Sequence, residues 1–134
     1  MIKRWLDNLK WDEGRQKSGY KKIKLLESKR FLFDMYLLYY PQGSAIAGHV
    51  DGVTFGNHYR LNYTIKKAKK GGIFLLAGKP IFRLGRLVIF RPDKQYHSVS
   101  QIEKGYRVVF SLGWVRKKNQ HGTTTQLHSE SVSQ

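Results

Sequence analysis

The stretch YRVVFSLGW, from Tyr106 to Trp114, is the last strong β-strand signal of the chain. Its apolar, β-branched and aromatic residues suit a pleated surface. Alternation along a strand places Arg107, Val109 and Ser111 on one face. If that face turns into a barrel, the buried guanidinium is costly unless an anion pairs with it. The stretch therefore predicts a core strand and an anion-binding position inside the fold.

Similar short runs occur upstream of this strand. Strands are predicted at residues 21–26, 31–40, 58–65, 73–78, 81–84 and 86–90. Turn signals such as Pro41-Gln42-Gly43 and Pro92-Asp93 separate several of them. Many short strands with frequent turns predict a mainly β protein, an antiparallel sandwich or barrel.

The two ends of the chain differ from this β-rich middle. Ile2, Trp5, Leu6 and Leu9 follow helical spacing, which predicts a short amphipathic helix laid on the core. The C-terminal residues are polar and nearly without apolar anchors, as in a disordered tail. We therefore expect an N-terminal helix and loop over residues 1–20, a β domain over 21–116 and a tail over 117–134.

Composition limits the classes of function. The 134 residues include no cysteine, which excludes disulfides, thiolate zinc sites and iron–sulfur clusters. No apolar run approaches the roughly 20 residues of a membrane-spanning helix, so we predict a soluble, intracellular, cytoplasmic protein without a membrane partner. The net charge is +16, and the segment from Gly52 to Pro92 holds nine Lys or Arg and no acid. Such a surplus favours an acidic partner such as nucleic acid or a ribonucleoprotein, unless it only keeps the protein soluble.

The segment GHVDG places His49 and Asp51 two residues apart. On extended backbone both side chains leave the same face and could bind adjacent positions of a metal, although two polar residues in a turn would look the same. A third ligand is available in RPDKQYHSV, where His97 follows a strand and a proline turn. Two imidazoles and one carboxylate on one face of an octahedron form the facial triad of non-haem Fe(II) oxygenases. The other histidines are assigned to the tail or to a strand start: His121, His128 and His58.

Arg107 completes the hypothesis, because a dicarboxylate cosubstrate would supply the anion that its guanidinium needs. Two alternatives stay open. The side chain could turn outward, or it could pair with an internal acid. Few acids are available within the presumed barrel besides the candidate ligand: Asp34, Asp93 and Glu103.

Taken in order from Phe31 to Trp114, these segments resemble the 2-oxoglutarate/Fe(II)-dependent dioxygenases, most closely their prolyl 4-hydroxylase-like branch. The resemblance rests on four segments: YPQGSAIAGHVD (40–51), GGIF (71–74), GRLVIFRPDKQYHSV (85–99) and GYRVVFSLGW (105–114). Two features depart from the family pattern. The chain lacks a long N-terminal helical support, and Ile73-Phe74 follow the glycine pair where an acid and a threonine are usual.

The resemblance implies a double-stranded β-helix, a jelly-roll or cupin-like barrel, with iron held by His49, Asp51 and His97. It implies 2-oxoglutarate as cosubstrate, dioxygen, and ascorbate as a supporting reductant. The distal carboxylate of 2-oxoglutarate would meet Arg107. Further cosubstrate contacts are implied for Tyr40, by its position in the motif, and for Asn62 and Thr64, by the inward face of their strand. Arg60 shares that face and could reach the cosubstrate or the substrate. Tyr40 could instead be a core aromatic, and Asn62 could only satisfy backbone groups.

The predicted function is therefore hydroxylation of a C–H bond in a macromolecular substrate. The resemblance favours a peptidyl or prolyl substrate, whereas the charge favours nucleic acid or a ribosomal component. The alternative is a non-enzymatic basic β-barrel that binds nucleic acid through Lys, Arg and exposed aromatic residues. A cupin-like metal protein without 2-oxoglutarate is a third possibility, which Arg107 disfavours.

Overall fold

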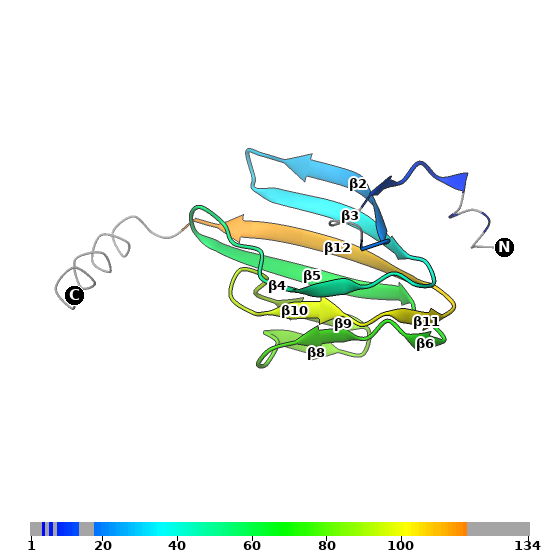
Figure 1. The fold of residues 1–134 in the computed structure, drawn as a ribbon. Coiled ribbons are helices and arrows are strands. Elements are labelled where there is room, and N and C mark those ends of the chain that lie inside the picture. The colour runs from blue at the N-terminus through cyan, green and yellow to red at the C-terminus, as the bar shows by residue number, and fades with distance from the viewer. Residues whose placement is uncertain (1–3, 5, 7, 14–17, 118–134) are drawn as a thin grey trace.

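The structure is a computed structural model that describes Arg4, Leu6 and residues 8–13 and 18–117 (Figure 1). Strands account for its regular elements: β1 (Asp12–Glu13), β2 (Lys21–Ser28), β3 (Phe33–Tyr40), β4 (Ile46–His49), β5 (Asn57–Lys66), β6 (Lys70–Gly71), β7 (Phe74–Leu76), β8 (Phe82–Leu84), β9 (Leu87–Phe90), β10 (His97–Val99), β11 (Ile102–Lys104) and β12 (Arg107–Arg116). They form a large sheet in the order β1-β2-β3-β12-β5-β9-β8, a smaller sheet β4-β10-β7 and the pair β11-β6. The prediction of a mainly β fold is confirmed.

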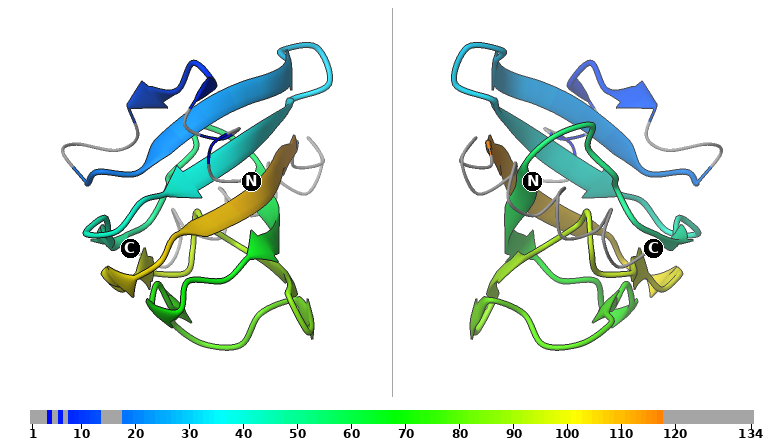
Figure 2. Two further views of the ribbon diagram at one scale, coloured as in Figure 1. Left: turned by 90° about the vertical axis from the view of Figure 1, so that its right-hand side faces the viewer. Right: turned by 90° about the vertical axis from the view of Figure 1, so that its left-hand side faces the viewer.

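Strand β12 lies at the centre of the large sheet, antiparallel to β3 on one side and to β5 on the other. The side views in Figure 2 show how strongly this sheet twists. One face of β12 is directed at the smaller sheet, and on that face Val109 is fully buried together with Val99 of β10 and Ile102 of β11. Two sheets that enclose a common core in this strand order make a double-stranded β-helix.

A second apolar cluster lies on the opposite face of the large sheet. Leu6 is 1% exposed and packs with Tyr39 of β3 and Val108 of β12. Trp11 adds a tilted aromatic contact to Tyr39, with ring centroids 5.4 Å apart. The N-terminal segment therefore covers one corner of the sheet's outer face, which agrees with its predicted packing on the core.

The predicted N-terminal helix is nevertheless not supported. Arg4, Leu6 and Asn8 have helical backbone conformation, but no helix is delimited within the described residues. Residues 1–3, 5 and 7 lie outside the described part of the chain, and so do residues 118–134 of the predicted tail. Helical spacing alone is a weak signal in so short a segment, because isolated helices of this length are marginal without tertiary support. The domain boundaries stay predictions.

The long strands were predicted, and so were the short strands β7, β8 and β9, whereas other short strands were missed. Residues 46–49, 97–99 and 102–104 form strands that no periodic pattern announced, and the basic turn near residue 70 contains β6. Elements of two to four residues are too short to display a period of two. Within the described residues, no helix is long and apolar enough to cross a membrane.

Candidate metal centre

The register of two short strands brings the two candidate histidines together. β10 runs antiparallel to β4, and His97 is the direct cross-strand partner of His49. Side chains of directly opposite residues leave the same face of a sheet and approach closely. The imidazole centroids are 4.3 Å apart. The smaller sheet therefore presents two imidazoles side by side.

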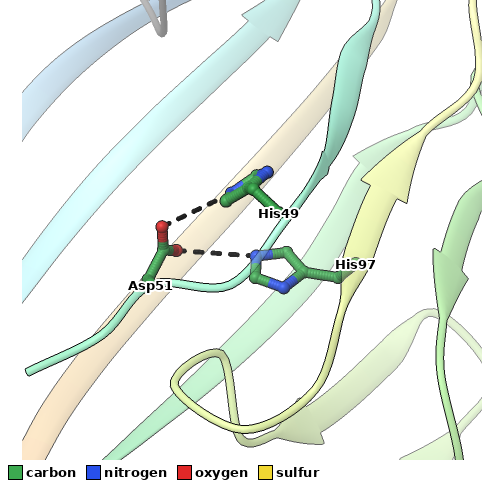
Figure 3. A group of neighbouring side chains, drawn as sticks. All are labelled: His49, Asp51 and His97. Carbon is green, nitrogen blue, oxygen red and sulfur yellow. Dashed lines mark ion pairs between the residues drawn. The ribbon is translucent and has the colours of Figure 1, made fainter.

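Asp51 joins them from the segment that follows β4 (Figure 3). Its main-chain N–H donates to the Pro92 carbonyl at 2.7 Å, which fixes the backbone just beyond the strand. Its carboxylate oxygens lie 3.4 Å from Nε2 of His49 and 3.5 Å from Nε2 of His97. The three candidate ligand atoms all lie within 4.8 Å of one another. The predicted His-x-Asp…His cluster is thus assembled by the fold.

The orientation of both imidazoles suits a metal. Nδ1 of His49 lies 2.8 Å from the Ala47 carbonyl, and Nδ1 of His97 lies 2.9 Å from the Gln95 carbonyl. A carbonyl can only accept, so each Nδ1 carries a proton, and in the neutral imidazole each Nε2 then keeps its lone pair. Two lone pairs and a carboxylate that converge on one point repel one another unless a cation lies between them. The donor set and its geometry therefore fit a divalent metal such as Fe(II).

An aromatic wall stands behind one side of this cluster. His97 is 8% exposed, and its ring contacts Phe90 edge-on with centroids 5.2 Å apart. Phe74 packs against Phe90 at 5.0 Å and lies 6.2 Å from the His97 ring. His49 and Asp51 are only partly buried. The cluster is consequently packed against aromatic rings on one side and accessible on the other.

A salt-bridged turn supports the carbonyl that anchors the aspartate. Arg91 donates from Nε and Nη2 to the two carboxylate oxygens of Asp93, at 2.9 and 2.7 Å. The main-chain N–H of His58 adds a third hydrogen bond to Asp93 at 3.2 Å. Burial alone would raise the pKa of Asp93, but the hydrogen bonds from Arg91 and His58 outweigh it and hold this pKa below its usual value. The Pro92 carbonyl, which accepts the hydrogen bond from the Asp51 N–H, therefore lies between two residues that are fixed by their mutual salt bridge, Arg91 and Asp93.

Arg107 begins the central strand and points into the same interior. It is the cross-strand partner of Tyr40, and its guanidinium lies 4.8 Å from the centre of that ring. The residue is 4% exposed, and burial lowers the pKa of its guanidinium. Burial also raises the pKa of Tyr40 to about 12, so this phenol is neutral at physiological pH. Arg107 is thus a desolvated cation stacked on a neutral ring.

The alternatives for Arg107 are both wrong in this structure. Its burial excludes an outward orientation, and no carboxylate of the described residues forms an ion pair with it. The three internal acids pair with other cations, at 2.8, 2.7 and 3.8 Å respectively: Asp34 with Arg60, Asp93 with Arg91 and Glu103 with Lys70. The fold therefore buries one guanidinium whose charge is left for a ligand to neutralise.

A cavity of about 280 Å³ connects the two features. The predicted site residues that line it are His49, Asp51, His97, Arg107, Tyr40 and Asn62. Thr64 is not among them and lines a second cavity, which it shares with Asn62 and Arg107. Thr64 pairs with Val109 as Asn62 pairs with Ser111, so the two side chains share one face of β5, and Thr64 lies two residues further along the strand, at the second cavity. Six of the seven predicted positions therefore share one cavity with the metal cluster.

Other residues of the cavity were underestimated from the sequence. Arg60 donates to Asp34 and to the Ser111 hydroxyl, both at 2.8 Å, and Ser111 donates to Asn62 at 2.6 Å. An acid within the otherwise apolar run FLFDMYLLYY was the available signal for this network. His58, assigned to a strand start, also lines the cavity. Its Nδ1 is buried without a hydrogen-bond partner, and burial is the main cause that lowers its pKa.

Known proteins resemble the chain in fold but not in sequence. No family model matches it, and no curated protein matches it either. A prolyl-4-hydroxylase from Pseudomonas putida superposes with a TM-score of 0.61 at 14% identity, over 88% of this chain and 82% of that one. A viral collagen prolyl hydroxylase from Paramecium Bursaria Chlorella virus-1, solved as a 2OG complex, gives 0.55 at 12% identity, over 75% and 81%. A cupin domain from Schizosaccharomyces pombe gives 0.57 at 14%, over 83% and 72%.

These similarities define the class of fold. Structures of such low identity share a double-stranded β-helix with this chain, and they include both prolyl hydroxylases and cupin domains. Fold alone does not determine function, because unrelated chemistry recurs on one scaffold. The protein is a cupin-like double-stranded β-helix with a candidate metal centre, and its activity has to be argued from the site.

Proposed function

We propose that the chain is an Fe(II)- and 2-oxoglutarate-dependent dioxygenase that hydroxylates a C–H bond. One observation carries this proposal: a single cavity contains both the His-Asp-His cluster and a buried, acid-free guanidinium. Metal ligands alone would suit many cupins. A desolvated arginine facing the same space calls for an organic anion as well.

Within this proposal His49, Asp51 and His97 hold the iron and leave the opposite side of its coordination sphere open. The backbone carbonyls on both Nδ1 atoms keep each Nε2 aimed at the metal. The bound iron would supply the activation of dioxygen, coupled to oxidative decarboxylation of 2-oxoglutarate. Ascorbate would keep the iron ferrous. The protein's own part is to orient, to desolvate and to balance charge.

Arg107 would bind the distal carboxylate of 2-oxoglutarate through two parallel hydrogen bonds. The Tyr40 side chain positions the guanidinium through its ring, 4.8 Å away, and through a side-chain hydrogen bond. Asn62, whose Oδ1 accepts from Ser111, offers its amide N–H groups as donors. The charges then cancel, because a dianionic cosubstrate and Asp51 offset a divalent metal and Arg107. Because the total charge is zero, the free-energy cost of burying the cosubstrate, Asp51, the metal and Arg107 together in a partly closed cavity is reduced.

The substrate proposed is macromolecular. Prolyl hydroxylases among the similar structures favour a peptidyl or prolyl residue. The net charge of +16 favours an acidic setting such as a ribonucleoprotein or nucleic acid. Lys22, whose ammonium lies 5.3 Å from the Tyr36 ring centre, adds a cation to the wall of the same cavity. A non-enzymatic nucleic-acid-binding barrel would need the same surface charge but gives no reason for the interior cluster.

Turnover of the cosubstrate tests the proposal. The protein is incubated with Fe(II), 2-oxoglutarate, ascorbate and dioxygen, and succinate is quantified. We expect succinate from the native protein, a loss of at least about 100-fold in His97→Ala, and little change in Arg116→Gln, whose side chain is exposed at the far end of β12. Succinate at the same background rate in the native protein and in His97→Ala, with lysate peptides and nucleosides supplied, would overturn the proposal. Mass spectrometry of the same mixtures for a gain of one oxygen identifies the substrate.

A further inference from the structure

A second cavity, of about 240 Å³, lies beside the first and shares Arg107 with it. Strands β5, β8 and β9 of the large sheet and the segment from Lys67 to Phe74 form its walls. Four cationic side chains line this cavity: Lys67, Arg83, Arg86 and Arg107. No Asp or Glu of the described residues lines it. Apart from Arg107, all its lining residues come from the acid-free segment between Gly52 and Pro92.

The strand pairing directs these cations to one place. Arg83 is the cross-strand partner of Val88, which is 7% exposed, so Arg83 lies on the inward face of β8. Arg86 follows the turn between β8 and β9, and its Nη1 donates to the Ile65 carbonyl at 3.0 Å. The Arg86 carbonyl in turn accepts from the Thr64 N–H at 3.0 Å. Arg86 is therefore held at the edge of the cavity, and its remaining guanidinium donors are available.

Neutral donors complete the lining. Thr64 contributes a hydroxyl, and Asn62 contributes the amide N–H groups that remain after its Oδ1 has accepted from Ser111. Lys67, Arg83 and Arg86 are exposed, so water solvates them when no ligand is present. Cations gathered around one cavity attract an anion, and guanidinium groups recognise the oxygens of a multiply charged anion in pairs.

We propose that this second cavity is a binding site for a phosphate-bearing anion, held by Arg83, Arg86 and Lys67. The assignment does not depend on the dioxygenase activity, since none of the three metal-cluster residues lines this cavity and none of the three cations is assigned to 2-oxoglutarate. An anion site at this position also explains why the segment from Gly52 to Pro92 is rich in Lys and Arg and lacks acidic residues. The phosphate could belong to a small phosphorylated compound or to a nucleic-acid backbone.

Direct binding to the metal-free, full-length protein tests the site. Inorganic pyrophosphate and a short single-stranded RNA are titrated calorimetrically into the native protein and into Arg83→Gln/Arg86→Gln. The matched control, Arg30→Gln/Arg116→Gln, removes the same charge from exposed arginines that line neither cavity. We expect pyrophosphate affinity to fall at least about tenfold in the cavity variant and less than about threefold in the control. Both variants change exposed residues, and thermal unfolding confirms that they fold.

The two titrations separate the sources of the phosphate. Pyrophosphate binding that depends on the cavity arginines, with RNA binding that does not, indicates a small phosphorylated ligand. RNA binding that is lost in the same variant and displaced by pyrophosphate indicates a phosphodiester backbone. Equal weakening of pyrophosphate in both double variants would reduce the effect to surface charge and overturn the site. The site is also overturned if 2-oxoglutarate depends on Arg83 and Arg86 as strongly as pyrophosphate does, because the cavity would then belong to the cosubstrate.

Discussion

Replacing Arg107 by methionine separates a structural arginine from a ligand-binding one. The change keeps an unbranched side chain against Tyr40 and removes the charge. Loss of the contact with the Tyr40 ring costs about 1–2 kcal/mol for a desolvated cation. Removing a buried charge that no carboxylate of the described residues neutralises relieves its desolvation penalty, which offsets this loss. The ligand-free protein should therefore unfold with an unchanged or slightly higher free energy.

The same substitution should be severe for the ligand. A truncated partner of a buried charge pair costs about 2–5 kcal/mol, which corresponds to a loss of about 30-fold to several thousandfold in 2-oxoglutarate affinity. Urea denaturation of the metal-free protein measures the first effect, and anaerobic titration of 2-oxoglutarate into the Fe(II)-loaded protein measures the second. Arg116→Met, at the exposed end of the same strand, is the control. A destabilisation above about 2 kcal/mol together with unchanged 2-oxoglutarate binding would refute the reasoning and make Arg107 a structural residue.

Three further predictions concern the fold and its pH dependence. Phe90→Ala, at a side chain that is 1% exposed, should lower the free energy of unfolding by about 3–5 kcal/mol; a loss below about 1 kcal/mol in urea denaturation would contradict the assigned core. Gly71→Ala and Gly43→Ala both place alanine at positive φ, but only at Gly71 would the new Cβ lie 2.0 Å from a backbone oxygen. Gly71→Ala should therefore lower the thermal unfolding temperature more than Gly43→Ala does. Equal effects of the two changes would refute the close approach at Gly71. The pKa of Asp93 is depressed in the folded protein, so the stability it contributes is present above its unfolded pKa of about 4 and is lost as the pH falls through the folded value. The stability difference between the native protein and Asp93→Asn should accordingly shrink below about pH 4, and a difference that stays constant from neutral pH to pH 2 would contradict the ion pair with Arg91.

Sequence reasoning reached the long strands and the interior polar residues for the same physical reason. A strand of ten residues such as β12 shows its two faces, and a charge on the apolar face, as at Arg107, predicts a buried cation that calls for an anionic partner. The pairing of His97 with His49 is different in kind. It depends on the register of two strands of three and four residues, and register is set by tertiary packing rather than by local pattern.

The detailed surroundings of the site residues are subject to the same limit. Thr64 shares a face of β5 with Asn62, as the alternation predicts, but it lies two residues further along the strand and lines the second cavity rather than the first. Arg60 shares the predicted face as well, and Asp34 on a separate strand accepts a hydrogen bond from it. Both outcomes depend on which strands become neighbours. The second cavity was invisible for this reason as well, because its cations come from three separate segments.

The central claim is that His49, Asp51 and His97 hold iron in the same cavity in which Arg107 holds an organic diacid. Optical spectroscopy under strict exclusion of oxygen tests it most directly, because chelation of Fe(II) by 2-oxoglutarate gives a visible charge-transfer band. We predict that the band appears when both components are added to the native protein, is absent with either one alone, and is lost in His97→Ala. A native protein that shows no band at saturating Fe(II) and 2-oxoglutarate, or a band of equal intensity in His97→Ala, would contradict the account.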